Sequence, residues 1–119
     1  MAKFDITYGI LRDEAVIATS TICISLTKKD IQEIEEHIVA HDYSPILSDL
    51  PERIYARCCN KALHEGNALC LSMGIEPTEE MAVAFSEVIP LCIVDTFTDE
   101  TAIKVKAKMR QILPEIFEQ

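Results

Sequence analysis

The stretch from Asp49 to Gly74 constrains the fold of this chain most strongly, because it predicts one long amphipathic helix. Apolar and small side chains recur in it at spacings of three and four residues, which places them on a single face. The residues of this face are Tyr55, Cys58, Cys59, Ala62, Gly66, Leu69, Cys70 and Met73. Charged side chains occupy the opposite face, so a core is expected along this helix.

Signals at both ends support the helix. Asp49 can cap the first turn, Pro51 needs no hydrogen-bond partner there, and Gly74 can adopt the left-handed conformation that ends a helix. The apolar face crosses Gly66 without a change of phase, which favours one helix over a break at this glycine. We expect Ala62 and Gly66 to form a close packing or interface contact, either with the N-terminal hairpin or with the same helix of a second subunit.

Residues 1–26 predict two β-strands. Apolar and polar residues alternate from Phe4 to Ile10 and again from Val16 to Leu26, which is the period of a strand with one buried face. The connection lies around Arg12-Asp13-Glu14 and lacks the Asn-Gly or Asp-Gly pair of the tightest hairpins. We therefore expect a loop of three or four residues between the strands.

Three further segments predict helices. Thr27 begins one whose narrow apolar stripe ends near His41, Thr78 begins a second, and Thr98 begins the last. The acidic outer faces of the first of these helices place it on the surface.

The segment 88–94 has two interpretations, because Pro90 lies inside an apolar run. A kinked helix through this segment is favoured by the phase of the apolar residues, and a third strand is favoured because a lone hairpin is marginally stable. The chain as a whole, 1–119, predicts a single α+β domain. In it an N-terminal antiparallel hairpin packs on a bundle of three or four helices around the long central helix.

Charge excludes two classes of partner. The chain of 119 residues has 20 acidic and 11 basic side chains and a net charge of −9, which disfavours binding to nucleic acid and to anionic membranes. Five cysteines without paired spacing, and no signal peptide, predict core thiols in a reducing compartment. We therefore expect a cytoplasmic protein.

Glu33, His37 and His41 are the candidate metal ligands. Their spacing of four residues aligns them along one edge of a predicted helix, as a transition-metal site requires. The sequence lacks the H-E-x-x-H pattern, and the competing interpretation is a solvated helix edge in which Glu33 pairs with His37. No cofactor is predicted.

No catalytic residue is predicted. Cys58 and Cys59 lie on the apolar face of the central helix and His64 lies on its polar face, so the three cannot form a nucleophile with its base.

High apolar content and a hairpin without proline lead us to expect a non-enzymatic, small cytoplasmic interaction, adaptor or regulatory-subunit-like protein. It would act through an oligomer or partner interface, as a homodimer or with another protein. The alternative is a small ligand- or metal-binding module, or a small enzyme, with a pocket between hairpin and helices. Its candidate residues are Tyr8, Tyr55, His41 and His64.

Overall fold

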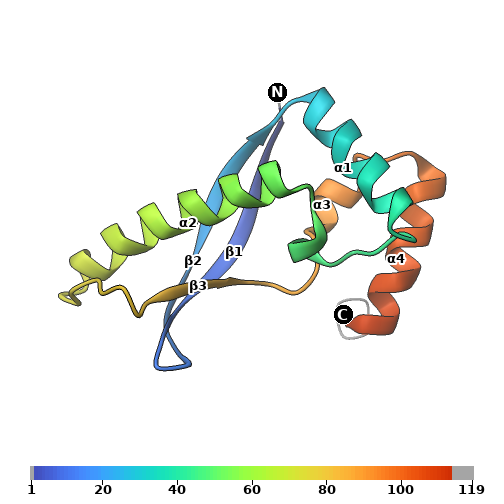
Figure 1. Ribbon diagram of the computed structural model, residues 1–119. Coiled ribbons are helices and arrows are strands. Elements are labelled where there is room, and N and C mark those ends of the chain that lie inside the picture. Colours follow the sequence, from blue (N-terminus) through green and yellow to red (C-terminus); the bar gives the residue numbers. More distant parts are fainter. Residues whose placement is uncertain (1, 114–119) are drawn as a thin grey trace.

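The computed structural model describes residues 2–113 of the chain (Figure 1). The elements in chain order are strands β1 (Ala2–Arg12) and β2 (Ala15–Leu26), helix α1 (Lys28–Ala40), the 3₁₀ turn η1 (Leu47–Asp49), helix α2 (Glu52–Ser72), strand β3 (Ala82–Phe85), and helices α3 (Leu91–Val94) and α4 (Asp99–Ile112). An N-terminal antiparallel hairpin with a third strand packs with four helices, so the α+β prediction is confirmed.

The hairpin has the alternation that its sequence predicts. β1 buries every second side chain from Phe4 to Ile10, and β2 places Ile22 and Ile24 opposite this row. The side chains between them lie on the other face of the sheet, which is largely exposed. One face of the hairpin therefore forms one side of the hydrophobic core.

The turn of the hairpin is tighter than predicted. Arg12 pairs with Ala15, so only Asp13 and Glu14 form the loop, and the expectation of three or four residues is wrong. Both loop residues have positive φ, 52° and 65°. Two successive left-handed residues give a turn whose twist matches that of the paired strands. Asp13 is of a residue type that adopts this conformation readily, whereas Glu14 is not, so strand pairing sustains the left-handed conformation at Glu14.

The third strand lies earlier in the chain than the alternative prediction placed it. β3 covers Ala82–Phe85 and pairs antiparallel with β1, from Tyr8 opposite Phe85 to Leu11 opposite Ala82, in a sheet of order β2-β1-β3. The predicted helix from Thr78 is therefore wrong, because this segment supplies the second neighbour of β1. Within 88–94, the short helix α3 follows Pro90.

Helix α2 is continuous through Gly66, as predicted, but it begins three residues after Asp49. Asp49 ends η1, and Pro51 is the N-cap residue without a side-chain hydrogen bond. At the other end Gly74 has a φ of 76°, and the backbone N–H of Ile75 donates to the carbonyl of Cys70 at 2.8 Å. This is the predicted glycine-terminated helix end.

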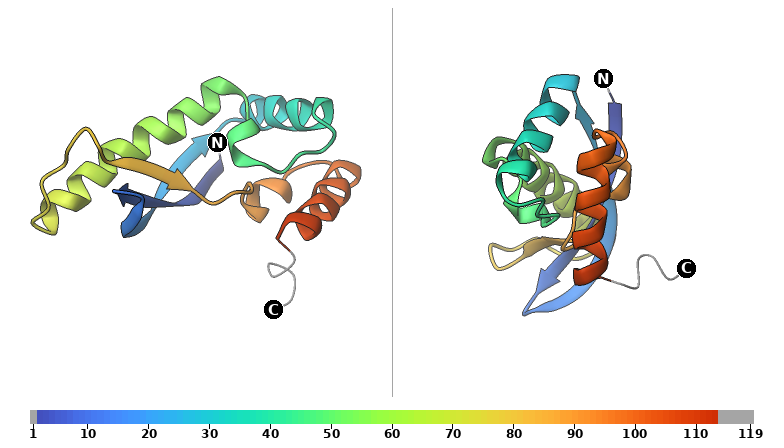
Figure 2. Two further views of the ribbon diagram at one scale, coloured as in Figure 1. Left: turned by 60° about the horizontal axis from the view of Figure 1, so that its bottom comes forward. Right: turned by 90° about the vertical axis from the view of Figure 1, so that its right-hand side faces the viewer.

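Helices α1, α3 and α4 gather at one end of the sheet, whereas α2 crosses one face of the three strands (Figure 2). Thr27 and Asp30 form a reciprocal capping box at the start of α1. The hydroxyl of Thr98, which precedes α4, donates to Glu35 of α1 at 2.9 Å. No helix in residues 2–113 has both the length and the apolar character needed to cross a membrane.

Candidate interaction site

The close contact predicted at Gly66 is made by the hairpin. Gly66 and Ala62 are buried on the face of α2 that meets the sheet. A Cβ atom added at Gly66 would lie 3.4 Å from Cδ1 of Ile10 and 3.5 Å from Cε2 of Tyr8. The missing side chain therefore lets two large β1 side chains pack directly under the helix.

One half of the outer edge of β2 is covered by side chains of α2. A guanidinium N–H of Arg57 donates to the carbonyl of Ser25 at 2.6 Å, and the ammonium of Lys61 donates to the carbonyl of Cys23. Four residues along α2 and two residues along β2 both advance by about 6 Å, so successive side chains in one row of the helix reach alternate carbonyls of the strand. A shallow hollow of ≈ 550 Å³ lies over this covered half.

The covering stops at Glu65, which is the next position in the same helical row. Its carboxylate cannot donate a hydrogen bond to a carbonyl, and its Oε2 is a buried side-chain oxygen without a partner among the described residues. The neighbouring Tyr8 hydroxyl interacts with Ser20 of β2, and burial raises the pKa of Tyr8 above its ordinary value. The edge of β2 near Ser20 therefore lacks the donors that cover Ser25 and Cys23.

The uncovered half of β2 has the composition of a pairing strand. All twelve residues of Ala15–Leu26 are uncharged, and none is proline. Among residues 2–113, β2 pairs with β1 alone, so no strand pairs with its other edge. Val16 is 60% exposed near the hairpin turn. Edge strands of soluble proteins usually have charges, prolines or covering segments that prevent pairing, and this half has none of them.

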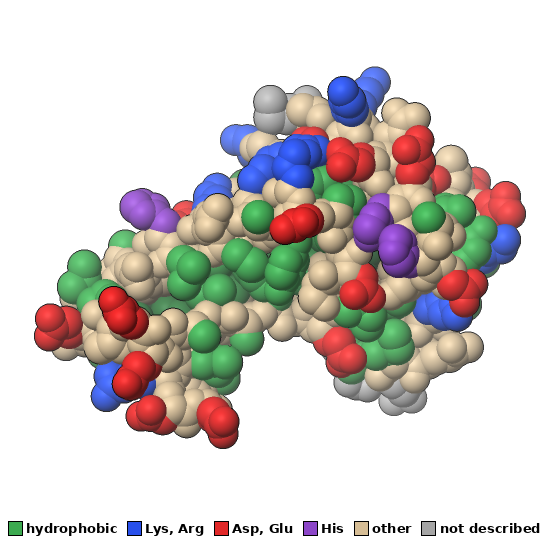
Figure 3. Space-filling model, in the orientation of Figure 1, with side chains coloured by type: hydrophobic (Ala, Val, Ile, Leu, Met, Phe, Trp, Pro, Cys, Tyr) green, Lys and Arg blue, Asp and Glu red, His purple; other side chains and the backbone are tan. Residues whose placement is uncertain are grey.

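At the opposite edge of the sheet a row of three hollows lies between α2 and β3, which we call the β3 groove; the middle one, beside Leu63 and Val83, is nearly filled and holds ≈ 10 Å³. Its apolar side chains are Tyr55, Leu63, Met81, Val83 and Phe85. Leu63 is 41% exposed and the other four are partly exposed. Figure 3 shows hydrophobic side chains along the line between α2 and β3, with acidic side chains at its ends.

The three candidate metal ligands are not brought together. Glu33 accepts from Arg53 at 2.6 Å, and its predicted pairing with His37 is replaced by this contact. The rings of His37 and His41 stack with centroids 4.1 Å apart, and Nδ1 of His41 lies 2.7 Å from the carbonyl oxygen of His37. Within residues 2–113, no group of three potential ligands is placed to hold a metal ion.

Asp30 is a buried carboxylate held by partners in the α1 cap and in α2. It is buried, accepts the backbone N–H of Thr27 at 2.9 Å, and pairs with Arg53 at 2.9 Å. The Thr27 N–H, followed by Arg53, lowers the pKa of Asp30 to about 2. Thr27 and Arg53 both stabilise the ionised form of Asp30. The Asp30 carboxylate therefore joins α1 to α2 and does not suggest acid–base chemistry.

The five cysteines differ in burial, and Cys59 is half-buried. Cys58 and Cys70 are buried in the core as predicted, and burial raises the pKa of the Cys58 thiol. Cys23 and Cys92 are exposed, so the expectation that every thiol packs in the core is wrong for these two. Cys23 lies on the outward face of an edge strand, where alternation exposes it.

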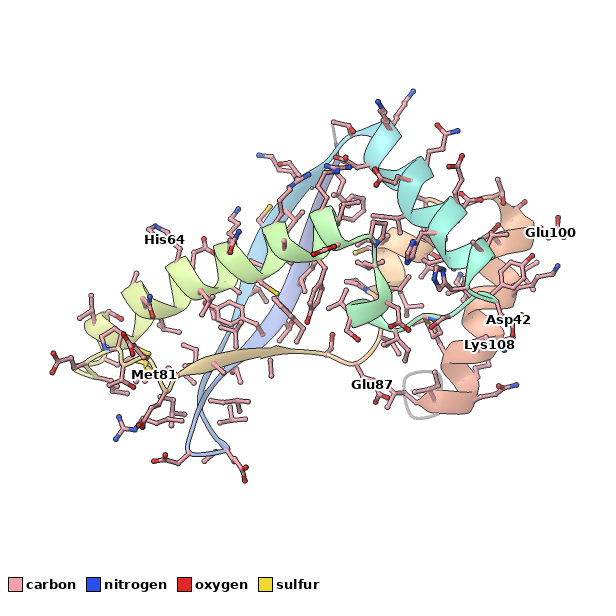
Figure 4. The ribbon with its side chains drawn as sticks, in the orientation of Figure 1. Asp42, His64, Met81, Glu87, Glu100 and Lys108 are labelled. Atoms are coloured by element: carbon pink, nitrogen blue, oxygen red, sulfur yellow. The ribbon has the colours of Figure 1, made fainter. Side chains whose placement is uncertain are left out.

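The residues of the alternative pocket lie in separate places. Tyr8 is buried beneath Gly66, Tyr55 packs edge-on against Phe85 with centroids 6.0 Å apart, and His41 stacks on His37 at the end of α1. His64 is exposed on the side of α2 away from β3 (Figure 4).

Comparison with known proteins gives no match: no family model matches the chain, no curated protein matches it, and no solved structure matches it. Any functional assignment therefore depends on the residues of this chain. Sequence reasoning recognised the long proline-free strand but missed the β3 groove, because it placed a helix at 78–88. The alternation of Met81, Val83 and Phe85 was the signal that could have identified it.

Proposed function

We propose that this protein is a non-enzymatic, cytoplasmic interaction or adaptor protein that forms a homodimer through the uncovered half of β2. The observation that carries this proposal is the uncovered half of the β2 edge, in a strand that has no charged residue and no proline. Its five free thiols suit a reducing compartment.

The hydrogen-bonding pattern of the hairpin gives the mode of pairing. The carbonyls of Ser25 and Cys23 point away from β1, because they accept from α2. By the alternation of an antiparallel pair, the backbone groups of Thr21 and Thr19 point away from β1 as well. Thr19 and Thr21 lie in the uncovered half of the β2 edge, and their backbone groups offer both donors and acceptors to a partner strand.

A second copy of the chain fits this edge because an antiparallel strand is complementary to itself. A twofold axis at Ser20 places Thr19 of each copy opposite Thr21 of the other, over a pairing of residues 18–22. Lys61 covers Cys23 and so limits the pairing at that end. Cross-strand threonine pairs contribute roughly 0.2–1 kcal/mol each, and the interface is isologous, as most dimer interfaces are.

The uncharged sequence of β2 and the unpartnered oxygen of Glu65 also support a second copy of the chain as the partner at this edge. The strand is uncharged, so two copies meet without repulsion at the paired residues, although the chain has a net charge of −9. The buried Glu65 oxygen needs a donor, and the hydroxyl of Ser20 in the second copy would lie on the same sheet face to supply one.

Thr19→Lys tests the proposal. We expect the native protein to have twice the chain mass of 13.4 kDa by light scattering, and we expect Thr19→Lys to have the mass of one chain, because a lysine on an edge strand opposes pairing. Thr7→Lys is the matched control. Thr7 is exposed on the same sheet face but belongs to the central strand β1, so this variant should remain a dimer.

A native protein with the mass of one chain at every concentration measured would overturn the proposal. So would a variant pair in which Thr7→Lys separates the subunits and Thr19→Lys does not, because the exposed sheet face would then be the interface. Circular dichroism of both variants verifies that each is folded. No observation favours the alternative of an enzyme or metal-binding module, and we do not propose it.

A further inference from the structure

The free edge of β3 already has a partner at one end, supplied by the chain itself. Ile46 and Val88 form an antiparallel bridge just beyond β3. The backbone N–H of Leu47 donates to Glu87 at 2.9 Å, and the N–H of Ile89 donates to Pro45 at 2.8 Å. The residues around Ile46, just before η1, therefore pair with the continuation of β3 through this one bridge.

Over Ala82–Phe85, no other segment of residues 2–113 pairs with this side of β3. The Gly9–Ala84 pair is a hydrogen-bonded one by the alternation along β1, which leaves the backbone groups of Val83 and Phe85 directed away from β1. Glu87 and Ile89 follow at intervals of two and direct their groups to the same side. An added strand in line with 45–47 would thus find unpaired donors and acceptors along β3.

The side chains of such a strand would alternate between the β3 groove and solvent. Those facing α2 would meet Leu63, Val83 and Phe85. Hollows lie at both ends of the groove: one of ≈ 520 Å³ is bordered by Met81, and one of ≈ 130 Å³ is bordered by Tyr55. In Figure 4, Met81 lies before β3 and Glu87 lies after it, so the groove spans this strand.

The acidic residues beside the β3 groove indicate the charge of a strand that would bind there. Glu79 and Glu87 border the two hollows, and Glu80 is exposed beside Glu79. None of the ion pairs within residues 2–113 uses these three carboxylates. A second copy would bring the same acidic rim against itself, whereas lysine or arginine side chains would neutralise it.

We propose that the β3 groove binds an extended segment of a partner protein in which apolar residues alternate with basic ones. The segment adds a strand to β3, directs its apolar side chains toward α2, and presents its cations to Glu79, Glu80 and Glu87. Backbone hydrogen bonds supply affinity and the groove supplies specificity, as in other cases of strand addition. This site lies at the opposite edge of the sheet from the self-association surface and does not depend on it.

A fluorescent synthetic peptide of alternating valine and lysine tests the proposal by fluorescence anisotropy. We expect it to bind the native protein. A block peptide of the same composition, and a peptide of alternating valine and glutamate, should both bind at least about tenfold more weakly, a difference of 1.4 kcal/mol. Binding of the block peptide equal to that of the alternating one would overturn the proposal, because it would show charge attraction without strand addition.

Two leucines of α2 give a matched pair of variants. Leu63→Ser should weaken binding of the alternating peptide about tenfold, since it removes an apolar wall of the groove. Leu71→Ser should leave binding unchanged, because Leu71 is 64% exposed and does not line the groove. Equal losses in both variants would overturn the assignment of the peptide to this groove.

Further variants test the contribution of charge to peptide binding and show whether the peptide binds at the β3 edge or at the β2 edge. Glu79→Gln combined with Glu80→Gln should weaken binding and reduce its dependence on salt, because both carboxylates are exposed at the rim. Folded Thr19→Lys should bind the peptide as the native protein does. Loss of peptide binding in Thr19→Lys would place the peptide on β2 and overturn this proposal, whatever its effect on the dimer.

Discussion

Gly66 shows how one absent side chain positions a strand beneath a helix. Tyr8 and Ile10 occupy the space next to its Cα, and both are buried. A methyl group would lie at ordinary contact distance from them, whereas a branched side chain would have to displace them. The size of the substituent, and not the helical conformation, therefore decides the outcome of a substitution here.

Gly66→Ala should raise the free energy of unfolding by up to about 1 kcal/mol, because it removes the helical penalty of glycine. Gly66→Leu should lower it by roughly 1–3 kcal/mol, because the added atoms overpack the contact with β1. Urea unfolding followed by circular dichroism measures both values. A neutral result for Gly66→Leu would contradict the close packing of hairpin and helix at this residue.

The ionisation of Asp30 contributes to the stability of the fold. The backbone N–H of Thr27 and then Arg53 lower its pKa from 3.8 to about 2. Asp30 binds a proton more readily in the unfolded state, where its pKa is higher. The stabilisation is therefore complete at a pH above the unfolded-state pKa, and it disappears as the pH falls through the folded-state pKa.

We predict that the native protein loses roughly 2 kcal/mol of unfolding free energy between pH 4 and pH 2 through this group. In Asp30→Asn this part of the loss should be absent, and the variant should be less stable than the native protein at neutral pH. Unfolding curves measured across this range test the prediction. An identical acid dependence in native protein and variant would contradict it.

At the scale of the element, the starts of α1 and α2 differ although both sequences suggested capping. Thr27 accepts from the N–H of Asp30 at 3.0 Å, and the Asp30 side chain completes the capping box. Asp49 instead accepts from the hydroxyl of Ser44 at 3.3 Å, on the surface, because η1 and Pro51 separate it from the first turn of α2.

Thr27→Ala should therefore cost about 1 kcal/mol of stability, the typical loss of an N-cap side chain. Asp49→Ala should change stability by less than about 0.5 kcal/mol, as exposed substitutions usually do. Chemical unfolding of the two variants under one set of conditions compares them. A larger loss from Asp49→Ala would show that this carboxylate caps α2 after all.

At the scale of the whole molecule, the two outer edges of the sheet differ. β2 has an uncharged edge, which we propose pairs with a second copy, and β3 has a short edge beside an acidic rim and apolar side chains, which we propose binds a basic segment. Helix α2 crosses the sheet between them, donating from Arg57 and Lys61 on one side and contributing Leu63 on the other. Under these two proposals, one chain holds a second copy and a partner together, as an adaptor does.

Local sequence was sufficient for the parts of this fold whose causes lie within a few residues of each other. The alternation of the hairpin, the amphipathic face of α2, its end at Gly74 and the Thr27 capping box all follow from side-chain periodicity and local hydrogen bonds. The candidate site depended on these elements but was not visible in any one of them.

Contacts between distant parts of the chain decided the remainder. The segment 82–85 is a strand because β1 has an unpaired edge beside it, and Glu33 turns to Arg53 because α2 lies against α1. The same is true of the contact at Gly66, where only the packed hairpin shows which neighbour takes the space. Pairing and packing energies depend on residues far apart in sequence, so short-range patterns could not predict them.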